Sequence, residues 1–188
     1  MAKQFTALDA TLTAFIGRQH VFFAASAAPG SRVNVSPKDG ASFRVLGPNR
    51  AAWLDQTGSG NETAAHTLAG GPVTVMFCAF QGPPLILRLY GRARIALRGA
   101  PDYARLLAEA FAGEEPPGAR QIVVLDFDLV QTSCGYGVPL FDHVGERDNL
   151  RRWAEAKGED GLDDYRREKN AVSLDGLPTG MFDLPAAE

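Results

Sequence analysis

One short stretch combines residue types that can bind an anion. GSGNETAAH, residues 58–66, places two glycines, a serine and an asparagine directly before a predicted helix. The backbone N–H groups at such a helix start, together with the helix dipole, can hold a phosphate. Ser59 and Glu62 also have the S-x-x-E spacing of a capping box, in which side chains satisfy the first backbone donors of a helix. The motif alone leaves both interpretations open, and its brevity favours the cap.

A second stretch supplies a cation. RVNVSPKDG, residues 32–40, predicts a strand that ends with the Ser36 hydroxyl and the Lys38 ammonium at its edge. This pair suits a phosphate, although the same residues are ordinary in a hairpin turn, where Lys38 would simply be solvated. The stretch is therefore a candidate anion site only in combination with another.

A third stretch is rich in arginine. In LILRLYGRARI, Arg88, Arg92 and Arg94 share one face of a predicted strand. Like charges in a row on one face of a sheet need anions or acidic partners nearby. Asp126 and Asp128 on a later predicted strand are the alternative to a bound ligand.

The elements that would position these stretches are mostly strands. A short amphipathic helix is expected over residues 9–18, capped by Asp9, and a second over 101–113, opened by Pro101. Gly91 predicts a bulge. The β-favouring runs are residues 20–27, 32–36, 43–47, 50–56, 72–80, 84–99 and 121–133. They predict a mainly β (α+β) fold: one antiparallel, barrel-like sheet of six or seven strands with peripheral helices.

The chain changes character after residue 135. Two charged helices are expected over residues 147–158 and 161–170, and they carry few apolar side chains. Such helices cannot build a core of their own. We therefore expect a barrel domain over residues 1–135 and an extension, residues 136–188, that packs on the barrel or on a second subunit and ends in a Gly/Pro-rich irregular segment.

Composition narrows the classes of function. The 188 residues carry a net charge of -3 and lack a dense basic run, so a nucleic-acid partner is not expected. The chain has neither an apolar signal-peptide core nor a run long enough to cross a bilayer, which predicts a cytoplasmic protein without a membrane partner. Its three histidines and two cysteines are scattered, and their spacing predicts no metal site.

The order of the motifs resembles a known family. A helix, a hairpin, a strand ending in SPK, a strand containing AWLD, the GSGNE helix opening, the VTVMF strand and the LRLYGRARI strand follow one another. This order resembles the pyridoxamine 5′-phosphate oxidase-like flavoproteins of the FMN-binding split-barrel type, over about residues 10–135. The tail, with CGYGVP and KNAVSLDGLP, is similar to an uncharacterised branch related to the oxidase.

The resemblance implies FMN in a groove at a homodimer interface. Three groups of residues would contact it: a basic segment, a phosphate loop at the helix opening, and residues beside the flavin ring. The basic segment would be Arg32, Ser36 and Lys38, and the phosphate loop would be Ser59, Gly60 and Asn61. Trp53, Leu54 and Asp55 would lie beside the flavin ring, and Arg88 would lie on the strand that lines the opposite side.

Two departures from the oxidase pattern bear on function. The oxidases carry Ser-Arg-Lys where this chain has Ser59, Gly60 and Asn61, so two phosphate-neutralising charges are absent. The Trp and Arg pair that handles pyridoxal phosphate has no counterpart in SLDGLPTGMF. Pyridoxamine phosphate oxidation is therefore not the leading expectation.

Three functions stay open at this point. The leading hypothesis is an FMN-dependent oxidoreductase acting on a small organic substrate, because hydride transfer at flavin demands no particular catalytic side chain. The alternatives are a flavin-binding or redox-sensing protein without turnover, and a split barrel that binds haem or a deazaflavin instead of FMN.

Overall fold

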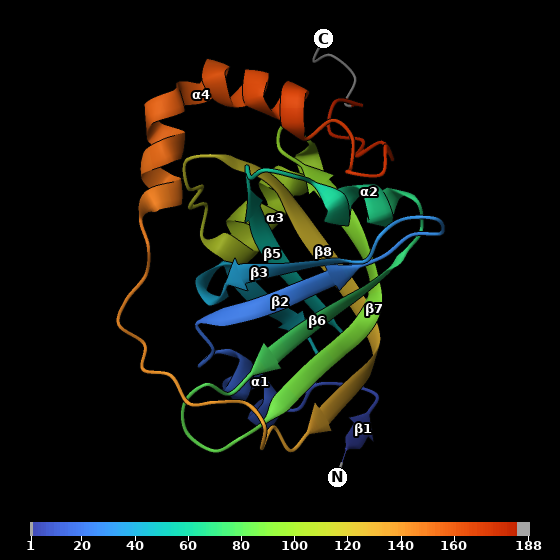
Figure 1. The fold of residues 1–188 in the computed structure, drawn as a ribbon, viewed down its shortest axis with the longest axis vertical. Helices are drawn as coiled ribbons and strands as arrows, with labels where there is room; N and C mark the ends of the chain where they lie inside the picture. Colours follow the sequence, from blue (N-terminus) through green and yellow to red (C-terminus); the bar gives the residue numbers. More distant parts are fainter. Residues whose placement is uncertain (1, 184–188) are drawn as a thin grey trace.

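The structure is a computed structural model that describes residues 2–183. A curled sheet dominates it, with helices at its ends and flanks (Figure 1). The elements of the described residues, in chain order, are β1 (Lys3–Phe5), α1 (Ala10–Ile16), β2 (Val21–Ser26), β3 (Asn34–Asp39), the 3-10 turn η1 (Gly40–Ser42), β4 (Phe43–Gly47), β5 (Arg50–Gln56), α2 (Glu62–Leu68), β6 (Pro72–Cys78), β7 (Ile86–Leu97), α3 (Pro101–Phe111), β8 (Ala119–Ser133) and α4 (Asn149–Lys169).

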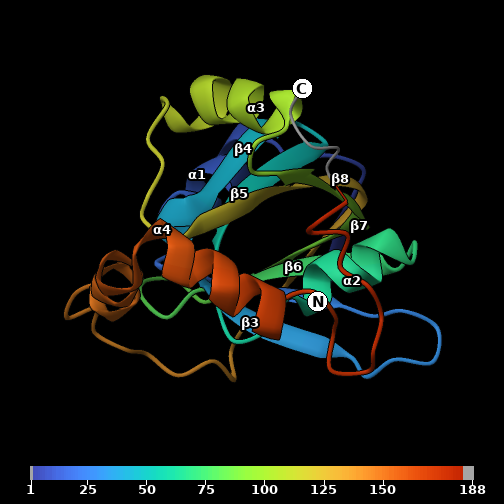
Figure 2. The same cartoon turned by 90° about the horizontal axis from the view of Figure 1, so that it is seen from above.

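All neighbouring strands are antiparallel, in the order β3-β2-β6-β7-β8-β5-β4. The 15-residue β8 pairs with β7 along one edge, and with β5 and then β1 along the other. Figure 2 shows the resulting curl, with β4 and β5 on one side and β3 and β6 on the other. The expected antiparallel split barrel is confirmed, and β1 is a strand that the sequence patterns did not predict.

Gly91 produces the predicted irregularity in β7. The register with β8 shifts between Tyr90 and Gly91. A Cβ atom built on Gly91 would lie 2.0 Å from the carbonyl oxygen of Asp126, so the two strands can approach this closely only at a glycine. The bulge bends the sheet at the middle of its longest strand pair and contributes to the curl.

The packing of the core explains why residues 51–54 of β5 are all apolar. Inside the curl, Phe22 packs edge-on against Phe43 and Trp53, at ring centroid distances of 5.0 and 5.8 Å. On the opposite face of the sheet, α3 covers β5 and β8 with Tyr103 and Leu106. Both faces of β5 are therefore buried. The polar residue near its carboxyl end, Asp55, enters the protein interior for this reason.

The helices follow the sequence signals closely. The Asp9 carboxylate accepts a hydrogen bond from the Leu12 backbone N–H at 2.7 Å, and Pro101 occupies the first turn of α3. Two consecutive helices, as expected, make up α4: Gly158 interrupts it with a φ of 67°. Within residues 2–183, no helix is both long and apolar enough to span a membrane.

The arginines predicted to share one face of β7 do not bind a common partner. Arg94 pairs with Asp102 of α3, and Arg92 donates to the Gly70 carbonyl oxygen. Asp126, one of the two acidic partners that the sequence offered as the alternative to a bound ligand, pairs instead with Arg50 at 2.5 Å. Each arginine thus finds a separate partner.

Candidate functional site

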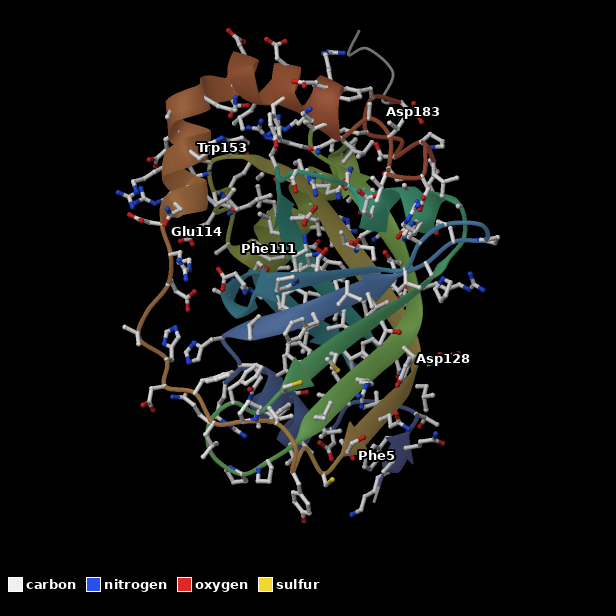
Figure 3. All side chains as sticks on the ribbon, viewed as in Figure 1. Phe5, Phe111, Glu114, Asp128, Trp153 and Asp183 are labelled. Atoms are coloured by element: carbon white, nitrogen blue, oxygen red, sulfur yellow. The ribbon has the colours of Figure 1, made fainter. Side chains whose placement is uncertain are left out.

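A pocket of about 450 Å³ lies between β3, the carboxyl end of β5 and the loop 57–61 that leads into α2. Ser36 and Lys38 line it from β3, and Ser59 and Asn61 line it from the loop. The pocket therefore joins the two candidate anion-binding motifs, which are separated by about twenty residues in the sequence. It lies toward the end of the molecule where Trp153 and Asp183 are labelled in Figure 3, away from Phe5.

Asp55 is the charged centre of the pocket wall. Its carboxylate is 4% exposed and accepts from the Lys38 ammonium at 2.6 Å, from the Arg120 guanidinium at 2.9 Å and from the Gln121 amide at 2.9 Å. Burial alone would raise the pKa of Asp55, but the charges and hydrogen bonds of Arg120 and Lys38 outweigh it and lower that pKa well below its ordinary value. Asp55 is thus held ionised inside the protein.

The loop 57–61 is fixed from behind by β8 and the C-terminal segment. Arg120 donates to the Gly60 carbonyl oxygen at 2.9 Å and to the Asn170 side-chain oxygen at 2.8 Å. Asn170, which is fully buried, in turn donates to the Gly58 carbonyl oxygen at 2.9 Å. Two carbonyl groups of a short loop are thereby pinned, which holds the remainder of the loop in one conformation.

A second buried arginine attaches α4 to the same loop. Arg166 is 5% exposed and donates to the Thr57 hydroxyl at 2.8 Å and to the Ala119 carbonyl oxygen at 3.0 Å. The Thr57 hydroxyl donates onward to the Gly118 carbonyl oxygen at 2.9 Å. We call Asp55, Thr57, Arg120, Gln121, Arg166 and Asn170 the buried polar network.

The capping-box prediction is wrong. α2 begins at Glu62 with Asn61 as its N-cap, and no side chain makes the capping hydrogen bond. The Glu62 carboxylate accepts instead from the Leu174 backbone N–H at 3.0 Å, and the Asn61 side chain accepts from Gln121 at 2.8 Å. The tail and β8 thus take the polar groups that a local cap would have used, and Ser59 stays exposed at the pocket.

The structure brings most of the predicted cofactor residues together. Three lie elsewhere: Arg32 pairs with Asp175 of the tail, Trp53 is buried in the core, and Arg88 on β7 donates to the Ser133 hydroxyl at 3.4 Å. The seven that line the pocket are Ser36, Lys38, Leu54, Asp55, Ser59, Gly60 and Asn61.

Sequence patterns missed Arg120, Gln121, Arg166 and Asn170, because the groups of the site that they bind are 47 to 112 residues away along the chain. A weak signal did exist. Arg120 and Gln121 stand immediately before the apolar run IVVL, so the sheet draws two polar side chains into the interior. Arg166 and Asn170 are four residues apart, and so share one face of a helix with few apolar anchors.

The pocket is equipped for binding rather than for proton transfer. Asp55 and Arg120 are committed to each other. The Lys38 side chain is 24% exposed, and its ammonium keeps further N–H donors in a pocket that Ser36 and Ser59 also line. Donors of this kind suit an anionic group such as a phosphate. Asp55 offsets one of the two cations in the wall, so the triad with Lys38 and Arg120 carries one net positive charge, and the carboxylates of Asp39 and Glu62 also line the pocket.

Comparisons with known proteins identify the family. A family model described as pyridoxamine 5′-phosphate oxidase matches residues 8–134. The pyridoxamine 5′-phosphate oxidase family protein ustO of Aspergillus flavus is 39% identical over 179 residues, covering 86% of this chain and 71% of that protein.

Solved structures share the fold at lower identity. A putative pyridoxamine 5′-phosphate oxidase from Lactobacillus delbrueckii has a TM-score of 0.52 at 19% identity, covering 67% of this chain and 94% of its own. HupZ from Group A Streptococcus has a TM-score of 0.53 at 17% identity, with coverages of 65% and 91%. With the family model spanning most of the curled sheet and the Aspergillus protein matching far into the tail, the chain belongs to the pyridoxamine 5′-phosphate oxidase family.

Proposed function

We propose that the protein is an FMN-binding flavoprotein and an FMN-dependent oxidoreductase acting on a small organic substrate. The observation that carries this proposal is the single pocket in which the SPK strand end and the GSGN loop meet. These are the two segments that the family resemblance assigns to the flavin phosphate, and the chain's family membership supports the assignment.

The donors of the pocket fit a phosphate monoester. Lys38, Ser36 and Ser59 would hold it, while the buried polar network keeps the loop carbonyl groups turned away from it. The Glu62 carboxylate also lines the pocket. It lies so close to Gly60 that a Cβ atom built on this glycine would be 2.6 Å from a carboxylate oxygen. We therefore expect FMN to bind more weakly here than in a relative with cations at positions 60 and 61. When bound, FMN would supply hydride or electron transfer.

The proposal includes a homodimer with the flavin at its interface. The edge strand β3 exposes Val35, which is 60% accessible, and Val33 immediately before the strand is 70% accessible; both are next to strand residues that line the pocket. Exposed apolar residues on an unpaired edge are a site for association. Light scattering of the purified protein at micromolar concentration should report two chains, and a monomer would contradict the interface site.

A visible absorption spectrum of protein purified without added cofactor tests the cofactor, together with mass analysis of whatever denaturation releases. A flavin spectrum with released FMN supports the proposal. A haem or deazaflavin spectrum would replace FMN by that group, and a colourless protein that does not bind added FMN would end the flavoprotein proposal.

A flavin-binding protein without turnover is the second candidate. The observation behind it is that the pocket acid Asp55 is engaged in ion pairs with Lys38 and Arg120, so a flavin reaction that also needs a proton carrier would not find one in this carboxylate. Repeated cycles of reduction by NADH or NADPH and reoxidation, followed at the flavin absorption band, separate the two. An oxidoreductase turns over many times per flavin, whereas a binding protein stops after one reduction.

A further inference from the structure

A second and larger cavity, of about 830 Å³, lies at the other end of β2 from the loop 57–61. Its walls come from α1, the β6–β7 connection and the segment 134–148, which we call the strap. Figure 1 shows the strap running from the end of β8 past α1 to the start of α4. Phe15, Phe80 and Phe141 give the cavity a largely apolar lining.

Three potential metal ligands meet at this cavity. His20, His143 and Glu146 all line it, and their ligand atoms lie within 4.8 Å of one another. The Glu146 carboxylate is 2.8 Å from His143 Nε2 and 3.8 Å from His20 Nδ1. The two imidazole rings stack at a centroid distance of 3.6 Å.

The grouping is unusual for this chain. It has only three histidines, and the third, His66, is buried and hydrogen-bonded to Ser26 at 2.9 Å. His20 and His143 are far apart in the sequence and meet because the strap folds back across the end of α1. Sequence spacing does not reveal this contact, because a ligand set assembled from distant segments has no local pattern.

We propose that His20, His143 and Glu146 bind a divalent metal ion of the zinc class and thereby fasten the strap across the cavity. Two imidazoles and one carboxylate are a ligand set that zinc accepts while leaving a fourth position open. Because all three residues line the cavity, an apolar molecule bearing an oxygen donor would be the kind of ligand to fill that position.

The few contacts that hold the strap give the metal a physical role. The Phe141 N–H donates to the Phe80 carbonyl oxygen at 2.9 Å, and the two aromatic rings stack at 5.4 Å. Leu140 and Val144 are 74% and 99% exposed, so burial of the strap's own side chains adds little. A metal ion joining residue 20 to residues 143 and 146 would cross-link the strap to the barrel.

Metal binding requires one rearrangement. Parallel stacked rings place their nitrogen lone pairs side by side, whereas a metal ion needs lone pairs that converge on one point. Because His20 and His143 have side chains 50% and 32% exposed, rotation of either ring is sterically available. A metal-bound structure should therefore show the two rings no longer parallel.

Calorimetric titration of the tag-free full-length protein with Zn²⁺ tests the site. We expect one saturable equivalent per chain, and at least about tenfold weaker binding in His20→Phe, His143→Phe and Glu146→Gln. Phenylalanine retains the ring stacking while removing the ligand nitrogen. Asp142→Asn, which removes a neighbouring strap carboxylate outside the cluster, is the matched control and should bind as the wild type does.

Hydrogen exchange of residues 139–146 supplies the second readout. Zn²⁺ should slow exchange in the wild type and leave it unchanged in His143→Phe, whose folding is checked by circular dichroism. The proposal is overturned if about 100 μM Zn²⁺ gives no saturable binding, or if the three ligand variants bind Zn²⁺ as tightly as the control.

Discussion

The pocket beside the loop 57–61 and the cavity under the strap are built in opposite ways. The smaller one, beside the loop 57–61, has walls fixed by charged and amide side chains such as Arg120 and Asn170, which are at most 5% exposed. The larger one, under the strap, is closed by exposed residues and a few aromatic contacts. A buried polar network specifies one geometry, because every partner that moves leaves an unsatisfied group. The first cavity is thus preorganised, and the second can adapt.

The largest expected effect follows from neutralising the centre of the buried polar network. Asp55→Asn leaves Lys38 and Arg120 without their counter-charge in the interior. Removing one partner of a buried ion pair costs about 3–5 kcal/mol, so the variant should lose that much free energy of unfolding, measured by urea denaturation. A loss below about 1 kcal/mol would show that water already reaches this network.

Lowering the pH should neutralise Asp55 gradually and so lower the free energy of unfolding step by step. The folded-state pKa of Asp55 lies below its unfolded value of 3.8, so its ionised form stabilises the fold above that value. As the pH falls below about 4, the unfolded chain takes up the proton first and this stability is lost. The wild type should lose more stability than Asp55→Asn between pH 5 and about 2; parallel curves would contradict the assignment.

A smaller effect is expected where the tail contacts the loop. Asn170→Ala removes the donor to Gly58 and the acceptor for Arg120. Arg120 keeps its bond to the Gly60 carbonyl oxygen, so the Gly58 carbonyl is the group left unpaired, at a total cost of about 1–3 kcal/mol. FMN retention should fall together with stability. Asn149→Ala at the exposed start of α4 is the matched control, and equal effects of the two variants would remove the special role of the tail.

The smallest effect belongs to an exposed ion pair. Arg151 and Glu155 are one helical turn apart on α4, 2.9 Å from each other and about half exposed. Such pairs contribute about 0.3–0.5 kcal/mol. Glu155→Gln should therefore shift the thermal midpoint hardly at all. A loss as large as that of Asn170→Ala would erase the contrast between buried and exposed charges.

Local patterns predicted most of the fold. The strands over residues 43–47 and 50–56 appear with the predicted bounds, and Gly91 and Gly158 interrupt their elements as expected. These features depend on side-chain periodicity and backbone conformation within a few residues, which the sequence displays directly.

The site was only partly predictable. The two segments that meet at the pocket, residues 32–40 and 58–66, could be predicted because each is a continuous stretch. The groups that hold them, Arg120, Arg166 and Asn170, act across long sequence separations and follow no fixed spacing. The same separation explains why the capping-box prediction is wrong. Ser59 and Glu62 have the S-x-x-E spacing of a capping box, but the Glu62 carboxylate accepts from the distant Leu174 N–H instead.

The most direct test of the account is the FMN affinity of three proteins, measured by quenching of flavin fluorescence: the wild type, Lys38→Gln and Lys3→Gln. Lys38 is the partly exposed cation of the proposed phosphate pocket, whereas Lys3 lies on β1, outside it. The account predicts that Lys38→Gln weakens FMN binding at least about tenfold, as expected for loss of a charge-assisted hydrogen bond, and that Lys3→Gln binds as the wild type does. Equal affinities for all three would place the flavin phosphate elsewhere and contradict the proposed site.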